Sequence, residues 1–217
     1  RQASDGQECR VRLHIDVAVP ELHTVPWELL WTEEEALLSA NANTPFARFL
    51  PVSLPWRGSV EGDVIHGLVL ISNPDDLETK YNLAALDVEQ ERATLEGIAE
   101  EINSDAEAPF ELDLTFLPPP ITLERLTEAL QEGAESGNAY DILHYLGHGV
   151  FSERRQQAAL LMQDAEGHTQ VVRDDQLVQM VTLQSTRPQL IFLAACQSAS
   201  RGTAEAFSGL APKLIQV

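Results

Sequence analysis

The sequence predicts an α/β fold in which a doubly wound, mainly parallel sheet is flanked by helices. Apolar runs such as Val64–Ser72 are almost continuous, which is typical of strands that are covered on both faces. Segments with leucine and isoleucine at helical spacing separate these runs. Such alternation of strand and helix favours right-handed crossovers and therefore a parallel sheet.

The first 60 residues predict a small N-terminal lobe. Val11–Val19 alternates apolar and polar residues, which predicts a half-buried strand that ends at Pro20. Pro26–Trp31 predicts a short helix with proline in its first turn. The segment 44–62 holds three prolines and two glycines, so we expect it to be irregular, with room for one strand. We therefore divide the chain into an N-terminal lobe, 1–60, and a core, 61–217.

The core predicts long strands and amphipathic helices in alternation. The long strands are expected over Val64–Ser72, Glu111–Leu117, Tyr140–Gly147 and Gln189–Ala194. The helices are expected over Leu83–Ile102, Thr122–Glu135 (with Thr122 as the capping residue), Asp174–Val181 and Thr203–Leu214. Two shorter segments, Ala158–Met162 and Thr169–Val172, flank the turn residues 164–167 and predict a hairpin over the edge of the sheet.

Composition excludes several classes of function. The net charge of −20, from 34 acidic and 14 basic side chains, argues against contact with nucleic acid or with an anionic membrane surface. No apolar run approaches the roughly 18 residues of a membrane span, and the first ten residues do not form a signal peptide. We therefore expect a cytoplasmic protein. Two cysteines cannot form a disulfide scaffold, and no cofactor motif is present.

Two motifs carry the functional prediction. Tyr140–Gly149 reads YDILHYLGHG and Leu190–Ala199 reads LIFLAACQSA, so each is an apolar strand that ends at a reactive residue. The first strand is expected to end at His148 and the second at Cys196, which follows 48 residues later. A histidine about 50 residues before a nucleophilic cysteine is the spacing of caspase-type proteases. The carboxyl ends of adjacent parallel strands meet at one rim of a sheet, where ligands of such sheets bind.

Peptide hydrolysis by a cysteine needs both a thiol and a nearby imidazole. A free thiol is only a few per cent ionised at pH 7, and a nearby imidazole can take its proton and later protonate the leaving amine. The glycines beside His148 allow close approach of the backbone to a substrate. The backbone N–H groups of Gly149 and Cys196 are candidates for an oxyanion hole.

Other interpretations exist for each residue alone. A cysteine at the end of an apolar strand is most often a small core residue, and a histidine in a glycine-rich turn is most often solvated. Because the histidine and the cysteine occur at matched strand ends with this spacing, we favour a catalytic role over these two interpretations. His144 and His148 have HxxxH spacing without a third ligand, so no metal site is predicted. A flavodoxin-like binding domain is disfavoured because GxGxxG and Walker loops are absent.

The motifs resemble the CHAT domain, a caspase-like branch of the clan that includes separases. The resemblance extends from residue 11 to 217. The segments that carry it are Val25–Trp31 (VPWELLW), Leu86–Glu91 (LDVEQE), Asp141–Gly149 (DILHYLGHG), Leu193–Ala199 (LAACQSA) and Phe207–Leu214 (FSGLAPKL). The resemblance implies a caspase-haemoglobinase-like fold and a cysteine endopeptidase with a dyad of His148 and Cys196. The alternative that we keep is a non-catalytic caspase-like scaffold that docks partners.

The resemblance also implies a biological setting. CHAT peptidases act in bacterial self/non-self responses, are switched on by a sensor or regulatory domain, and cut protein substrates that include gasdermin-like pore formers. Members of the family continue into a further strand, so we expect the C-terminal part of the domain to be missing and the isolated chain to be a poor catalyst. Basic-specific relatives carry an acidic residue two positions before the nucleophile. Here Ala194 lies at that position of the substrate pocket, which predicts no requirement for arginine or lysine.

Overall fold

The computed structural model describes residues 11–15, 22, 25–31, 37, 46–49, 63–152, 154–155, 157–195 and 214. The chain forms two compact units, Arg1–Pro55 and Trp56–Ile215. The first unit contains strands β1 (Val11–His14) and β2 (Phe46–Phe49), which pair in parallel, and a 3₁₀ turn, η1 (Trp27–Leu29). A strand, a short helix and a second strand were predicted here; residues 16–20 lie outside the described part of the chain.

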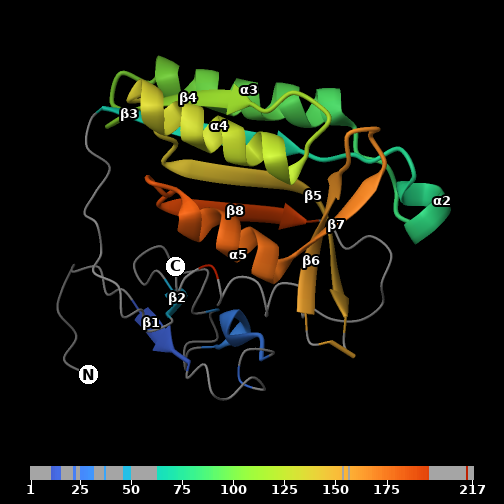
Figure 1. Cartoon of the computed structure of the whole chain (residues 1–217). Coiled ribbons are helices and arrows are strands. Elements are labelled where there is room, and N and C mark those ends of the chain that lie inside the picture. Colours follow the sequence, from blue (N-terminus) through green and yellow to red (C-terminus); the bar gives the residue numbers. More distant parts are fainter. Residues whose placement is uncertain are drawn as a thin grey trace. The chain divides into compact units, whose positions relative to one another are not determined.

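The second unit is built on a curled sheet of six strands (Figure 1). Its strands are β3 (Val64–Ile71), β4 (Glu111–Phe116), β5 (Ile142–Ser152), β6 (Gln157–Gln163), β7 (Thr169–Arg173) and β8 (Leu190–Ala195). The strand order is β4-β3-β5-β6-β7, and β8 also pairs with β5.

The prediction of a mainly parallel sheet is wrong, because the sheet is mixed. β3 pairs in parallel with β4 and β5, and β5 pairs in parallel with β8. The hairpin of β6 and β7 was predicted correctly, but it does not lie over an edge. It joins the sheet through antiparallel pairing of β6 with the second half of β5.

In the described part of this unit, four helices accompany the sheet, namely α2 (Leu77–Tyr81), α3 (Val88–Ser104), α4 (Leu123–Ser136) and α5 (Asp174–Leu183). Thr122 caps α4 as predicted, since its side chain accepts a hydrogen bond from the Arg125 N–H at 3.1 Å. α3 begins later than predicted because Asp87 caps it in the same way. The short α2 was not predicted. The helix predicted over 203–214 falls outside the described residues, except for Leu214.

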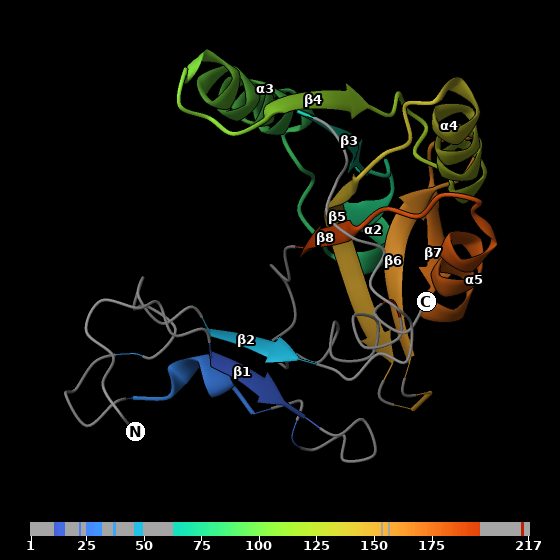
Figure 2. The same cartoon turned by 90° about the vertical axis from the view of Figure 1, so that its left-hand side faces the viewer.

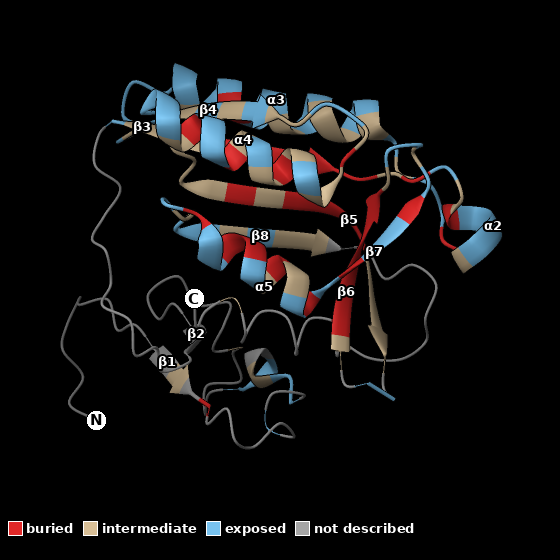
Figure 3. Cartoon of the chain, viewed as in Figure 1, coloured by how far each residue is buried: buried red, intermediate tan, exposed pale blue. Residues whose placement is uncertain are grey.

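The two faces of the sheet bury different side chains, as strand alternation requires. Val69, Ile71 and Leu146 form a core with Val88 and Leu95 of α3 on one face. The larger core lies on the other face, where strand residues pack with residues of α4 and α5 (Figure 3). Its members on strands include Leu68, Leu70, Leu143, Tyr145 and Leu160, all at most 2% exposed. Buried residues make up the largest share of β6 and β3, and the buried residues of β5 lie in its middle, from Leu143 to His148.

None of the helices in the described residues is both long and apolar enough to cross a bilayer.

Candidate active site

β5 changes its pairing partner at the glycine before His148. Ile142–Gly147 pairs in parallel with β8, and the last of these pairs joins Gly147 to Ala195. From His148 onward the same strand pairs with β6, starting with His148 opposite Leu161. The prediction that the strand ends at Gly147 and that His148 sits in a turn is therefore wrong. The strand continues to Ser152, and beyond Gly147 the hairpin is its neighbour.

The imidazole of His148 is buried and held by a backbone carbonyl. His148 is 1% exposed, and its Nε2 lies 2.8 Å from the carbonyl oxygen of Ala84. A carbonyl oxygen only accepts hydrogen bonds, so Nε2 must carry the proton. In the neutral imidazole the other nitrogen, Nδ1, is then the acceptor. The fold thus selects the tautomer in which Nδ1 can accept a proton.

The segment that presents the Ala84 carbonyl is itself fixed. It connects α2 to α3, and the Leu83 N–H donates to the Leu77 carbonyl at 3.3 Å. The side-chain oxygen of Asn73, at the end of β3, accepts the Leu86 N–H at 2.9 Å. These two hydrogen bonds, one on each side of Ala84, therefore fix the position of the carbonyl group that accepts from His148.

Tyr145 braces β5 from the opposite face of the sheet. Its hydroxyl lies 3.0 Å from the His148 carbonyl and 2.9 Å from the Leu161 carbonyl, the first residue pair after the change of partner. Burial raises the pKa of Tyr145, so the hydroxyl stays protonated and donates. The ring runs directly beneath Gly147: a Cβ at that position would lie no farther than 2.9 Å from Oη, Cζ and Cε1. Gly147 is required by this close approach.

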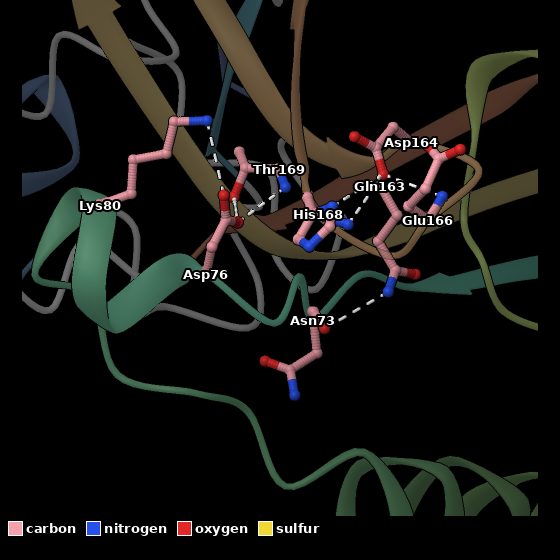
Figure 4. A network of polar contacts seen from close by, with 8 residues as sticks. All are labelled: Asn73, Asp76, Lys80, Gln163, Asp164, Glu166, His168 and Thr169. Carbon is pink, nitrogen blue, oxygen red and sulfur yellow. Dashed lines mark hydrogen bonds and ion pairs between the residues drawn. The ribbon is translucent and has the colours of Figure 1, made fainter.

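The hairpin is tied to the loop that follows β3 (Figure 4). Asp76 accepts hydrogen bonds from the Thr169 N–H, at 2.7 Å, and from the Thr169 hydroxyl. These bonds lower the pKa of Asp76, with a smaller contribution from Lys80, whose Nζ lies 3.5 Å away. The Gln163 amide donates to the Asn73 carbonyl at 3.4 Å and accepts the Ile121 N–H at 2.7 Å. Asn73 therefore contacts both the hairpin and the segment that holds His148.

The predicted nucleophile lies just beyond the described part of β8. Ala195 is the last described residue of that strand, and Cys196 is outside the described residues, as is Cys9. Ala194 is half-buried against the core formed by Val69, Ile71 and Leu146. Gly149 lies within β5 opposite Leu160. The roles predicted for Cys196, Gly149 and Ala194 stay predictions.

His144 lies on the same face of β5 as His148, four residues earlier. Its ring meets the ring of Phe192 edge-on, with centroids 4.9 Å apart. Nε2 is buried without a hydrogen-bond partner in the described part of the chain. Burial lowers the pKa of His144, and the carboxylate of Glu91 opposes this shift. His144 is therefore a neutral histidine that resists protonation.

We expect His144 to make the folded state weaker in acid. Its pKa is lower in the folded than in the unfolded chain, so unfolding takes up a proton below about pH 6.5 and stability falls as the pH decreases further. His144→Phe should lose this part of the pH dependence. Free energies of unfolding at pH 8 and pH 5 measure it: the difference between the two should be smaller in the variant. An equal difference in both proteins would contradict the assignment.

Sequence reasoning missed three contributors to the site: the Ala84 carbonyl, the Asn73 anchor and the Tyr145 brace. Asn73 directly follows the strand predicted over Val64–Ser72, where an asparagine by itself indicates only a turn. The carbonyl has no sequence signal, since any residue offers one. Among the described residues, no group of three or more histidine, cysteine or acidic side chains could hold a metal ion.

Comparison with known proteins gives one match. A family model described as the CHAT domain matches residues 2–217, which is nearly the whole chain. Searches of curated proteins and of solved structures found no match.

Proposed function

The chain belongs to the CHAT domain family of caspase-like peptidases, and we propose that it hydrolyses peptide bonds with Cys196 as nucleophile and His148 as general base. The observation that carries this proposal is the register of β5 and β8. Gly147 and Ala195 are partners, and each directly precedes one of the two proposed catalytic residues.

Strand alternation supports the same pairing. Leu146 and Ala194 are register partners and contact the same core beside α3. Side chains two residues apart on a strand point to the same face. His148 follows Leu146 by two residues and lies on the face of Ala84. Cys196 follows Ala194 by two, so our proposal requires β8 to stay extended through Cys196, which would place the thiol on the same face.

The tautomer of His148 fits the role of base. With the Nε2 proton donated to Ala84, Nδ1 takes the proton of the Cys196 thiol. The thiolate attacks the substrate carbonyl carbon, and the oxygen becomes an oxyanion. The imidazolium returns the proton to the leaving amine as the C–N bond breaks, which leaves a thioester. Water, deprotonated by the same imidazole, then releases the acid and regenerates the thiol.

The remaining roles complete the proposal. The backbone N–H groups of Gly149 and Cys196 stabilise the oxyanion, where one donor typically contributes about 3–4 kcal/mol. Ala194 offers no carboxylate, so cleavage does not require a basic residue before the scissile bond. A sensor domain, a gasdermin-like substrate and a role in bacterial defence follow from the family resemblance, and expression of the full-length protein with such a substrate tests them.

A peptidyl electrophile tests the dyad directly. The full-length protein should form a covalent adduct on Cys196, detected by mass spectrometry of the digested protein. Cys196→Ala should form no adduct and should have no peptidase activity. Its free energy of unfolding should stay within about 1 kcal/mol of that of the parent protein. A substrate library in the same assay should show no exclusive preference for arginine or lysine. Undiminished cleavage by folded Cys196→Ala would end the cysteine-peptidase proposal.

A further inference from the structure

β4 is the end strand of the sheet, and its outer edge is partly open (Figures 1 and 2). The N–H groups of Glu111 and Leu117 donate to carbonyls of the β3 side, at 2.7 and 2.9 Å. In a parallel pair, alternate residues bond to the same neighbour. Leu112, Leu114 and Phe116 therefore turn their backbone groups away from β3.

One of these three positions is already filled. The Asn103 side chain, at the end of α3, donates to the Leu112 carbonyl at 3.0 Å and accepts the Leu112 N–H at 2.7 Å. This amide takes the place of a neighbouring strand at one end of the edge. The outward N–H and C=O groups of Leu114 and Phe116 have no such partner in the described residues. Open edge groups of this kind accept a further strand.

A polar groove of about 630 Å³ runs beside this edge, on the face that carries α4. β4 contributes Asp113 and Thr115 to it, and α4 contributes Glu128 and Glu132. Asp113 lies 3.2 Å from His66, but the carboxylates of Glu128 and Glu132 have no cationic partner in the described residues. Arg125, the basic residue of the groove, donates to the Pro120 carbonyl at 3.3 Å.

The opposite face of the same edge has a different character. Arg92 of α3 lies over the Phe116 ring, 4.4 Å from its centroid, and 3.6 Å from Glu96. A recess of about 110 Å³ beside it is lined by Val88, Phe116 and other residues of this face. An added strand would place alternate side chains over these two faces. The groove side suits basic residues, and the Arg92 side suits apolar ones.

We propose that the β4 edge binds an extended segment of a partner protein in which basic and apolar residues alternate. Backbone pairing at Leu114 and Phe116 supplies the attachment, and Glu128 and Glu132 select the basic face. The site uses neither His148 nor Cys196, so the partner protein docks away from the proposed catalytic residues and its binding does not depend on peptidase activity.

The probe is an acetylated, amidated Lys-Val-Lys-Val-Lys peptide, titrated into the whole chain carrying Cys196→Ala so that no cleavage occurs. We expect saturable binding with backbone amide shifts at Leu114 and Phe116 in NMR spectra. Replacing both valines by proline removes two backbone N–H groups and should abolish binding. A Glu-Val-Glu-Val-Glu peptide should not bind.

Matched variants separate this site from general attraction to an acidic protein. The double change Glu128→Gln and Glu132→Gln should weaken binding about fivefold at low salt. Glu124→Gln with Glu135→Gln alters the same helix and the same net charge outside the groove, and should leave affinity unchanged. Equal effects of the two pairs, equal binding of the proline peptide, or shifts centred on His148 would overturn the proposal. So would a β4-mediated dimer in sedimentation experiments, because a second copy would then be the occupant.

Discussion

His148→Ala is expected to lower kcat/KM for peptide hydrolysis about 10³-fold in the full-length protein. The variant loses the group that takes the thiol proton and returns it to the leaving amine. The effect should not add to that of Cys196→Ala, because two residues that act as one unit lose their contribution together. Single-turnover cleavage assays on both single variants and the double variant measure this coupling.

A second histidine provides the control. His168 lies in the turn of the hairpin, with a side chain 57% exposed, and His168→Ala should leave the cleavage rate within about twofold. Since His148 is buried, unfolding curves must show that His148→Ala remains folded under assay conditions. Strictly additive losses in log rate for His148→Ala and Cys196→Ala would show that the two residues do not act together.

Gly147→Ala is expected to destabilise the core by about 3 kcal/mol, at the upper end of overpacking changes. The new methyl group would collide with the Tyr145 ring, which is fully enclosed and cannot move aside without losing its bonds to the two carbonyls. Either Tyr145 or the strand must shift, and the His148 backbone shifts with them. Urea unfolding of the core measures the loss.

Two comparisons make this expectation specific. Gly97→Ala adds the same methyl group in the interior of α3, where nothing lies within 4 Å, and should raise stability by roughly 0.5–1 kcal/mol. Tyr145→Leu shortens the side chain, so Gly147→Ala should cost less in that background. An equal cost in both backgrounds would show that the Tyr145 ring is not the obstacle.

Local patterns predicted most elements of the core because each element satisfies its own requirements. The apolar run at 64–72, the alternation at 111–117 and the Thr122 cap each correspond to an element with nearly those bounds. The register of β5 and β8 could also be predicted from the sequence, since two parallel strands were expected to end at His148 and Cys196. The pairing of Gly147 with Ala195 agrees with that expectation for the described residues.

The predictions that were wrong concern features that depend on contacts between distant segments of the chain. The glycines around His148 indicated a turn, but Gly147 is small because Tyr145 lies beneath it. The hairpin could be predicted from its own residues. Its antiparallel pairing with the second half of β5 depends on which strand lies beside it, and no local sequence pattern predicts that. This pairing turns a parallel sheet into a mixed one.

The change of partner along β5 also determines where the chain can tolerate insertions. Extra residues in the exposed turn at 164–168 lengthen the path from His148 to Cys196, but strand pairing still sets Ala195 opposite Gly147. One residue inserted between Leu146 and His148 would instead turn the imidazole to the Tyr145 face and away from Ala84. The spacing of 48 residues is thus a property of this hairpin and helix. The chemistry constrains strand register, so relatives can differ widely in this interval.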